Sequence, residues 1–241
     1  MGLTKSKIER NLRRVRENIR AACERAGRDA DKVSLVAVTK AVGAEAIGWL
    51  VDLGVSDLGE NRVQQLVARS GELADRLARR RSPAPTVRWH MIGHLQRNKV
   101  KAALDCAEMI HSVDSLRLAE EISERAEKVG RTVRVLLQVN CSHEAQKSGV
   151  AVGAATHMGQ LVTTLPNVRL AGLMTMAQIT DDPEAARPAF VRFRELFDEM
   201  RNEKIGGDDF QHLSMGMSQD YAVAVEEGAT LVRVGSALFE Q

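Results

Sequence analysis

Eight short apolar runs, each followed by a stretch with helical periodicity, constrain the fold of this chain more than any other feature. The runs are rich in β-branched and other apolar residues, which favours strands. Their nearly continuous apolarity is typical of parallel strands that are buried on both faces, with helices between them. The predicted strands cover residues 33–39, 55–59, 87–93, 108–113, 133–140, 168–175, 210–216 and 231–236.

The intervening segments carry signals for the ends of helices. A helix over 115–130 is expected to begin at Asp114 or Ser115 and to end at its last residue, a glycine. Another helix over 183–204 follows Asp182 and has a proline at its first position, where the missing N–H costs nothing. Eight strand–helix units predict an α/β fold, a single (β/α)₈ TIM barrel, preceded by an extra N-terminal helix.

Length and composition fit one such domain. The chain has 241 residues, of which 44% are hydrophobic, so we expect a single domain over residues 1–241. The 34 basic and 32 acidic residues nearly balance, which argues against nucleic-acid or membrane partners. Cys23, Cys106 and Cys141 show no CxxC spacing, so neither disulfides nor a zinc site are expected. No signal peptide or membrane-length apolar run is present, and we expect a cytoplasmic protein.

The ends of the predicted strands indicate where the site lies, because barrels of this type carry their chemistry at the C-terminal ends of the strands. Lys40 follows the first strand. The loops after the seventh and eighth strands, the usual phosphate site of this fold, supply two backbone N–H groups and two hydroxyls. These predicted phosphate ligands are Gly235, Ser236, Ser214 and Ser218.

A lysine beside a phosphate site has a specific chemical use. In a pocket of low dielectric its amine is partly neutral and can attack an aldehyde to form a Schiff base. Two partners fit Lys40 on these grounds: a sugar-phosphate aldehyde, as in an aldolase, or pyridoxal 5′-phosphate (PLP).

His90 and His94 are four residues apart, a spacing that would suggest a metal pair on a helix. The surrounding residues, however, read as a strand with His90 facing inward. We therefore interpret His90 as a hydrogen-bonded core histidine and predict no metal site.

Seven segments, in their order along the chain, are distinctive: "VAVTKAV", "LGENRVQQL", "WHMIGHLQRNKVK", "IHSVDSLRLAEEI", "VLLQVNCSHEAQKSGV", "LAGLMTMA" and "LSMGMSQDYAVAVEEGATLVRVGSALF". Together they resemble the pyridoxal phosphate homeostasis protein family, also called the YggS or PROSC family. The resemblance covers about residues 34–239 and implies a barrel similar to the N-terminal domain of alanine racemase. It also implies bound PLP and a role in keeping the intracellular level of this cofactor in check, without established catalytic turnover.

The resemblance also implies roles for individual residues. Lys40 would be the Schiff-base lysine, Asn61 would lie beside the cofactor ring, and Arg233 would face the pyridine nitrogen. The position of Asn61 before a predicted helix also suits an N-cap. The implied phosphate-binding positions are Ser218, Gly235 and Ser236, with Ser214 assisting.

Racemases of this fold use a second proton donor, a tyrosine from an additional domain. The single tyrosine here, Tyr221, is expected at the barrel rim rather than over the cofactor. We therefore predict a non-catalytic PLP carrier that is monomeric and makes transient contacts with PLP-dependent apo-enzymes. A PLP-dependent amino-acid racemase or lyase of low activity is the first alternative, and a Schiff-base aldolase without a cofactor is the second.

Overall fold

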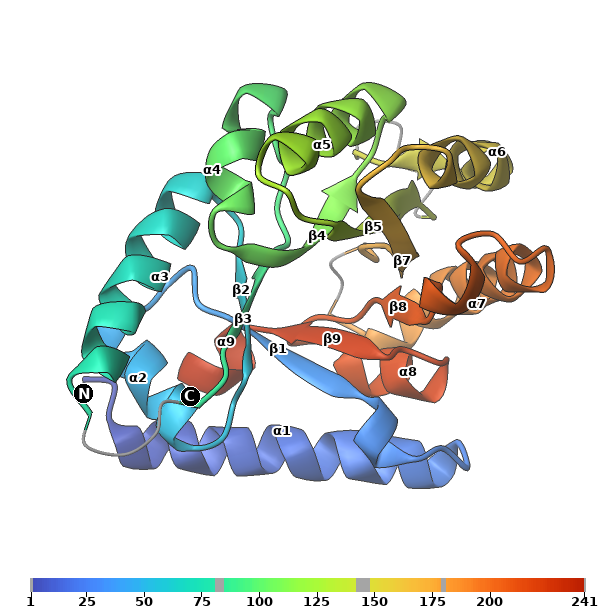
Figure 1. Ribbon diagram of the computed structural model, residues 1–241. Coiled ribbons are helices and arrows are strands. Elements are labelled where there is room, and N and C mark those ends of the chain that lie inside the picture. The colour runs from blue at the N-terminus through green and yellow to red at the C-terminus, as the bar shows by residue number, and fades with distance from the viewer. Residues whose placement is uncertain (1, 81–84, 142–147, 179–180, 241) are drawn as a thin grey trace.

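Eight parallel strands close into a barrel in the computed structural model, which describes residues 2–80, 85–141, 148–178 and 181–240 (Figure 1). Neighbouring strands pair in chain order, and the ring closes where the last strand pairs with the first. The fold is therefore a (β/α)₈ TIM barrel. Its strands are β1 (Ser34–Val38), β2 (Asp57–Glu60), β3 (Arg88–Met91), β4 (Ala107–Val113), β5 (Val133–Asn140), β7 (Val168–Met174), β8 (His212–Ser214) and β9 (Leu231–Val234).

All eight predicted strands are confirmed, and only their ends differ. The largest difference is at β8, which has three residues where seven were predicted. One strand was not predicted: β6 (Val150–Ala151) pairs with the end of β5 outside the ring. Two residues are too few to show a periodic pattern.

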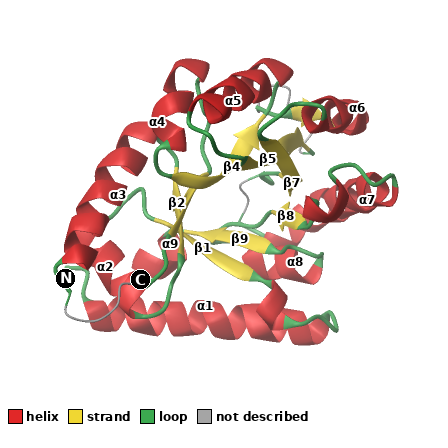
Figure 2. Ribbon diagram, viewed as in Figure 1, coloured by secondary structure: helices red, strands yellow, loops and turns green. Residues whose placement is uncertain are grey.

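The helices surround the barrel (Figure 2). The helix predicted over 115–130 is present, with Ser115 at its N-cap position but without a side-chain capping bond. Asp182 and Pro183 open a short 3₁₀ turn, Pro183–Ala186, that precedes the long helix. The helices are α1 (Lys5–Arg25), α2 (Ala44–Asp52), α3 (Val63–Ala78), α4 (Val100–Leu104), α5 (Leu116–Lys128), α6 (Val152–Thr163), α7 (Arg187–Asn202), α8 (Tyr221–Glu226) and α9 (Ser236–Phe239). No helix in the described residues is long and apolar enough to cross a membrane.

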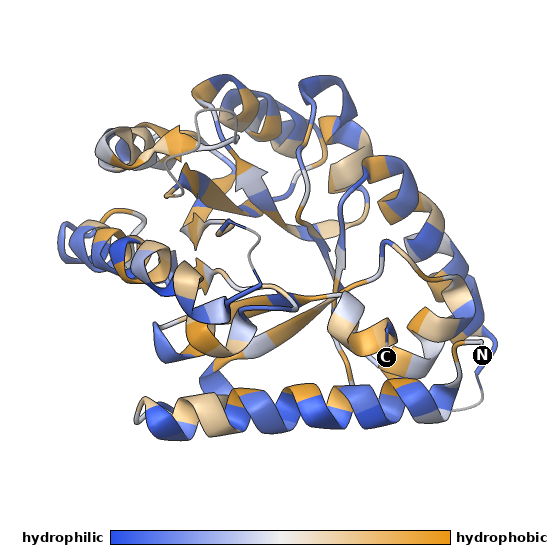
Figure 3. Ribbon diagram, turned by 180° about the vertical axis from the view of Figure 1, so that it is seen from behind, coloured by the Kyte–Doolittle hydropathy of each residue, from blue (hydrophilic) through white to orange (hydrophobic). Residues whose placement is uncertain are grey.

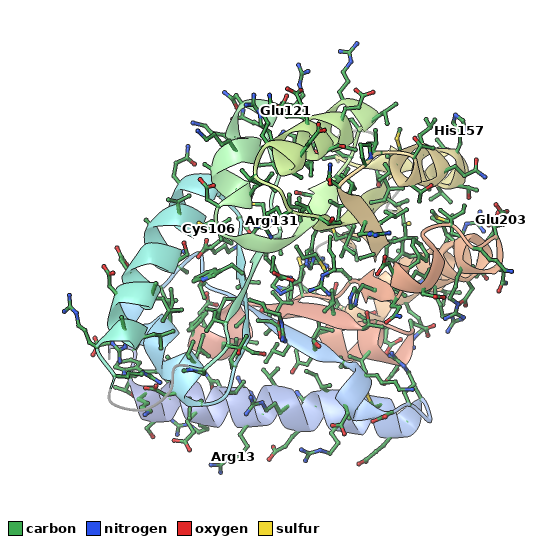
Figure 4. The ribbon with its side chains drawn as sticks, in the orientation of Figure 1. Arg13, Cys106, Glu121, Arg131, His157 and Glu203 are labelled. Carbon is green, nitrogen blue, oxygen red and sulfur yellow. The ribbon has the colours of Figure 1, made fainter. Side chains whose placement is uncertain are left out.

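The extra N-terminal helix α1 packs along the barrel beside α8 and α9. Its apolar face is turned toward the barrel in Figure 3, and Arg13 projects away from the barrel on the other face in Figure 4. Asn11 Nδ2 donates to Leu238 O at 3.1 Å and to Glu240 O at 3.0 Å. The helix therefore holds the segment after β9, which forms one side of the site described below.

The strands alternate between side chains that face the helices and side chains that face the barrel interior. On β9, Val232 and Val234 pack outward into the main core, while Leu231 faces a small apolar cluster inside the ring and Arg233, the alternate residue, is buried beside it. The interior also holds buried polar residues, among them His90 and His111. Such groups must find hydrogen-bond partners inside the barrel, because leaving them unpaired there is costly.

Candidate functional site

A cavity of about 560 Å³ lies at the C-terminal ends of the barrel strands. It is lined by residues from the loops after β1, β2, β3, β8 and β9, which are distant in sequence. Six of the seven residues predicted for the site line this one cavity: Lys40, Asn61, Ser218, Arg233, Gly235 and Ser236.

Lys40 stands two residues beyond β1 and is exposed at the cavity. A buried carboxylate supports the backbone on which it stands: Glu60, at the end of β2, accepts hydrogen bonds from Thr39 Oγ1 and Arg69 Nη1. Arg69 Nη2 also donates to the carbonyl oxygen of Lys40 at 3.3 Å. Among the described residues, the amine has no hydrogen-bond or ion-pair partner, while the backbone that carries it is held through Glu60 of β2 and Arg69 of α3.

Ser218 joins the two loops of the predicted phosphate site. Its Oγ accepts hydrogen bonds from the backbone N–H of Gly235 at 3.0 Å and of Ala237 at 3.3 Å. Gly216, with φ of +88°, allows the tight turn after β8, since a Cβ there would lie 2.5 Å from Ala224 Cβ. The loops after β8 and β9 therefore present small polar groups to the same side of the cavity.

Asn61, which follows β2, is half-buried and also lines the cavity. Its backbone lies against Gly93, where a Cβ would come within 2.3 Å of Asn61 O. The interpretation of Asn61 as a helix N-cap is wrong, because α3 begins at Val63 and its N-cap position is Arg62, which makes no side-chain capping bond.

Arg233 forms the buried floor of the cavity. Its Nη1 donates to Ser214 Oγ at 2.5 Å and its Nη2 to Thr175 O at 2.8 Å. Burial lowers the pKa of Arg233 to about 10, an effect that nearby Asp220 opposes, so the guanidinium remains charged at neutral pH. Ser214 differs from the other predicted residues, since it is fully buried below the floor and does not line the cavity.

The two histidines of the possible metal pair lie in different surroundings. His90 is buried and is hydrogen-bonded to Asp57 and His111, which confirms its interpretation as a core histidine. His94 is exposed, lines the cavity and has Nδ1 3.6 Å from Asp114 Oδ2. Within the described ranges, no group of three or more His, Cys, Asp or Glu side chains could hold a metal ion.

Tyr221 stands away from the cavity, as predicted. It is buried at the start of α8, and its hydroxyl accepts a hydrogen bond from Asn18 Nδ2 of α1 at 2.9 Å. Cys141, at the end of β5, is also unsuited to chemistry, since burial raises the pKa of its thiol despite an opposing hydrogen bond with Thr175.

Several lining residues were not selected from the sequence. Arg62 and His94 follow β2 and β3 almost directly, so the rule that chemistry follows strand ends could have identified them. Gln138 and Met176 gave no comparable signal, because a glutamine within an apolar strand and a methionine in a loop have many structural explanations.

Comparisons with known proteins define the class. The alanine racemase N-terminal domain family matches residues 10–241. Alanine racemase from Clostridium difficile 630 superimposes with a TM-score of 0.73 over 98% of this chain and 56% of its own, at 15% identity, a likeness that concerns the fold alone. The chain is thus an α/β barrel of the alanine racemase N-terminal type.

Two more similar proteins identify the family within this class. The pyridoxal phosphate homeostasis protein of Aquifex aeolicus is 41% identical over 95% of both chains. PipY from Synechococcus elongatus, solved with PLP bound, superimposes with a TM-score of 0.80 at 31% identity, over 96% of this chain and 99% of its own. The chain belongs to the pyridoxal phosphate homeostasis protein family.

Proposed function

We propose that this protein binds PLP through Lys40 and serves PLP homeostasis as a carrier of the cofactor. The observation that carries the proposal is the convergence of an exposed lysine, a small-residue phosphate side and a buried guanidinium on one cavity. Its relatives support the same function, since they are named for PLP homeostasis and PipY has been solved with PLP bound.

The residues present fit the three functional groups of PLP. The cofactor supplies an aldehyde that condenses with amines, a phosphate, and a pyridine ring that withdraws electrons. Lys40 would hold the aldehyde end, Asn61 would lie beside the ring, and the phosphate would lie at Ser218, Gly235 and Ser236. Ser214 would then act through Arg233 rather than by direct contact, because it does not line the cavity.

Arg233 favours a carrier over a catalyst. A guanidinium can only donate hydrogen bonds, so it would leave the ring nitrogen unprotonated. Carboxylates, which can share a proton with that nitrogen, make PLP a stronger electron acceptor. With Arg233 in this position the cofactor would be held but weakly activated.

The open cavity suits transfer of PLP to other proteins. An exposed Lys40 and Ser236 leave the cofactor within reach of solvent and of a recipient, which suits transfer to PLP-dependent apo-enzymes. We propose that residues 1–241 act as one monomeric domain for this purpose. The cytoplasmic location remains a prediction from the sequence.

Mass spectrometry of the borohydride-treated protein tests the proposal directly. Borohydride should fix one PLP per chain covalently, and peptide mapping should place it on Lys40. Lys40→Ala should lose this attachment, whereas Lys101→Ala, an exposed lysine of α4 that does not line the cavity, should retain it. A protein that takes up no PLP, or fixes it on another lysine, would contradict the assignment.

The main alternative is an amino-acid racemase or lyase of low activity. The position of His94 favours this alternative, since the side chain lines the cavity and an imidazole can transfer a proton. The two functions are separated by incubating the PLP-loaded protein with L-amino acids and following their chirality. Turnover well above that of free PLP, and lost in His94→Ala, would favour the enzyme.

A further inference from the structure

A continuous chain of buried hydrogen bonds crosses the interior of the barrel from the floor of the cavity to the opposite mouth. Arg233 Nη1 lies 2.5 Å from Ser214 Oγ, and Ser214 Oγ lies 3.0 Å from His111 Nδ1. His111 Nε2 lies 2.9 Å from His90 Nδ1, and His90 Nε2 lies 3.0 Å from Asp57 Oδ1. Five strands contribute one residue each: β9, β8, β4, β3 and β2.

The far end of the chain is anchored by an ion pair. Arg88, the cross-strand neighbour of Asp57, donates from Nε to Oδ1 and from Nη2 to Oδ2, both at 2.6 Å, and Ser56 Oγ donates to Oδ2 at 2.9 Å. Burial alone would raise the pKa of Asp57, but hydrogen bonds from His90, Arg88 and Ser56 hold it well below its usual range. Asp57 is therefore an anion that only accepts hydrogen bonds.

The two ends fix the direction of every bond between them. Arg233 can only donate and Asp57 can only accept. With neutral imidazoles, His90 then carries its proton on Nε2 and accepts at Nδ1, His111 does the same, and Ser214 donates to His111. Burial, reinforced by the charge of Arg233, lowers the pKa of His111 well below its usual value, which favours the neutral ring.

In this arrangement each middle residue donates once and accepts once along the chain, so no part of it can rotate without breaking a bond. The three middle residues, Ser214, His111 and His90, are at most 3% exposed, so water cannot readily replace a partner lost there. Arg233 is therefore held from below by Ser214 and Thr175.

We propose that Ser214, His111, His90 and Asp57 form a positioning relay that fixes the guanidinium of Arg233 beneath the ring of the bound cofactor. The proposal rests on the proposed function for the identity of the ligand, while the relay itself belongs to this chain. Asp57 lines a separate cavity at the N-terminal end of the barrel. A substitution of Asp57 should nevertheless change the affinity of the distant site for PLP.

The first test needs no cofactor. Histidine ¹⁵N NMR at pH 8 should show both His111 and His90 as Nε2–H tautomers. Ser214→Ala should shift the Nδ1 resonance of His111 and, through the chain, that of His90. Finding His111 as the Nδ1–H tautomer, or finding either ring unaffected by Ser214→Ala, would overturn the relay.

Ser112 provides a matched control. It neighbours His111 on β4, it is 1% exposed, and its Oγ has no hydrogen-bond partner in the part of the chain that the structure describes. Ser112→Ala removes the same hydroxyl at similar depth without touching the relay, so the histidine resonances and PLP affinity should stay as in the wild type.

The second test measures PLP binding by titration of absorbance. Ser214→Ala should weaken binding roughly tenfold and shift the visible band, with attachment still at Lys40. Asp57→Asn, which keeps an acceptor for His90 and serves as the second variant if Ser214→Ala misfolds, should weaken binding roughly threefold from the far mouth. Wild-type affinity and spectrum in both variants would refute the relay. Failure of the wild type to bind PLP would instead refute the proposed function, and the relay would then be tested by the NMR experiment alone.

Discussion

The rim and the floor of the cavity hold their cationic side chains in opposite ways. At the rim, Lys40 is exposed, and among the described residues it forms no ion pair. At the floor, Arg233 is 4% exposed and is bonded to Ser214 and Thr175. The group that would react with an aldehyde is thus exposed, whereas the group that would face the ring is buried and hydrogen-bonded.

This difference suits a protein that must both bind and release a reactive aldehyde. An exposed amine can be reached by a competing amine from solvent or from a recipient. A fixed floor keeps the ring in one orientation without closing the site. The predictions below test how far the two regions differ, from the largest expected effect to the smallest.

Removing the cation should cost far more stability at the floor than at the rim. Arg233→Ala leaves Ser214 Oγ and Thr175 O without their donor and opens a cavity, so the free energy of unfolding of the cofactor-free protein should fall by about 3 kcal/mol. Lys40→Ala should change it by less than about 0.5 kcal/mol. Urea unfolding measures both changes, and equal losses of stability in the two variants would contradict the difference between floor and rim.

Gly93→Ala should disturb the rim by steric means. A Cβ at this position would meet the backbone of Asn61 at 2.3 Å, so the loop after β2 must shift, at about 2 kcal/mol of stability and with weaker PLP binding. Gly153→Ala on α6 is the matched control, since its Cβ would meet nothing within 4 Å and should be tolerated. Equal behaviour of the two variants in thermal unfolding would contradict the close approach of Asn61.

Acid should destabilise the barrel through its buried histidines. Burial lowers the pKa of His111 and of His212 below 6.5, so below that pH the unfolded chain takes up protons that the folded chain cannot. Stability should therefore fall as the pH drops below about 6.5, by up to about 1.4 kcal/mol per pH unit for each group, with His111 giving the larger share because its pKa is lowered further. The stabilising ionisation of Asp57, whose pKa is depressed, is lost only below about pH 4 and does not contribute in this window.

The slope can be assigned with two variants on one strand. His111→Gln removes the titrating group but keeps a donor and an acceptor, so the loss between pH 6.5 and 5 should become shallower by about 1.4 kcal/mol per unit. Ser112→Ala should keep the wild-type slope. An unchanged slope in His111→Gln, measured by urea unfolding across this range, would show that the ring is not held neutral.

Tyr221→Phe should have the smallest effect. The change removes the hydrogen bond from Asn18 on α1 and should lower the free energy of unfolding by about 1 kcal/mol. Because Tyr221 does not line the cavity, covalent fixation of PLP on Lys40 should be unchanged. A loss of PLP binding would place this tyrosine in the site after all.

The sequence predicted more of the rim than of the floor. Lys40 directly follows one predicted strand, Gly235 and Ser236 are the last residues of another, and the barrel carries its chemistry at such positions. The strands themselves were recognisable because a parallel strand that is covered on both faces must be apolar along its length. The ends of β8 were placed less well, since its pairing with β9 rests on a single register pair.

The hydrogen-bonded residues below the cavity could not be predicted from strand ends. Asp57, His90, His111 and Ser214 lie on four strands, and nothing in their spacing shows that they meet. Ser214 was assigned to the phosphate because it lies near the C-terminal end of the seventh predicted strand, whereas the structure buries it against Arg233 and His111. Which way an inward side chain points depends on the stagger of the neighbouring strands around the ring.

The sequence by itself therefore determined the barrel, the order of its units and the residues at the strand ends, because local apolar patterns and chain order specify these. Only the tertiary structure decided which inward polar groups share a hydrogen bond, because closing β9 onto β1 is what brings Arg233 into the same interior as residues far from it in the chain. Burial then requires these groups to pair, and the pairing gives the site a hydrogen-bonded floor beneath an exposed lysine.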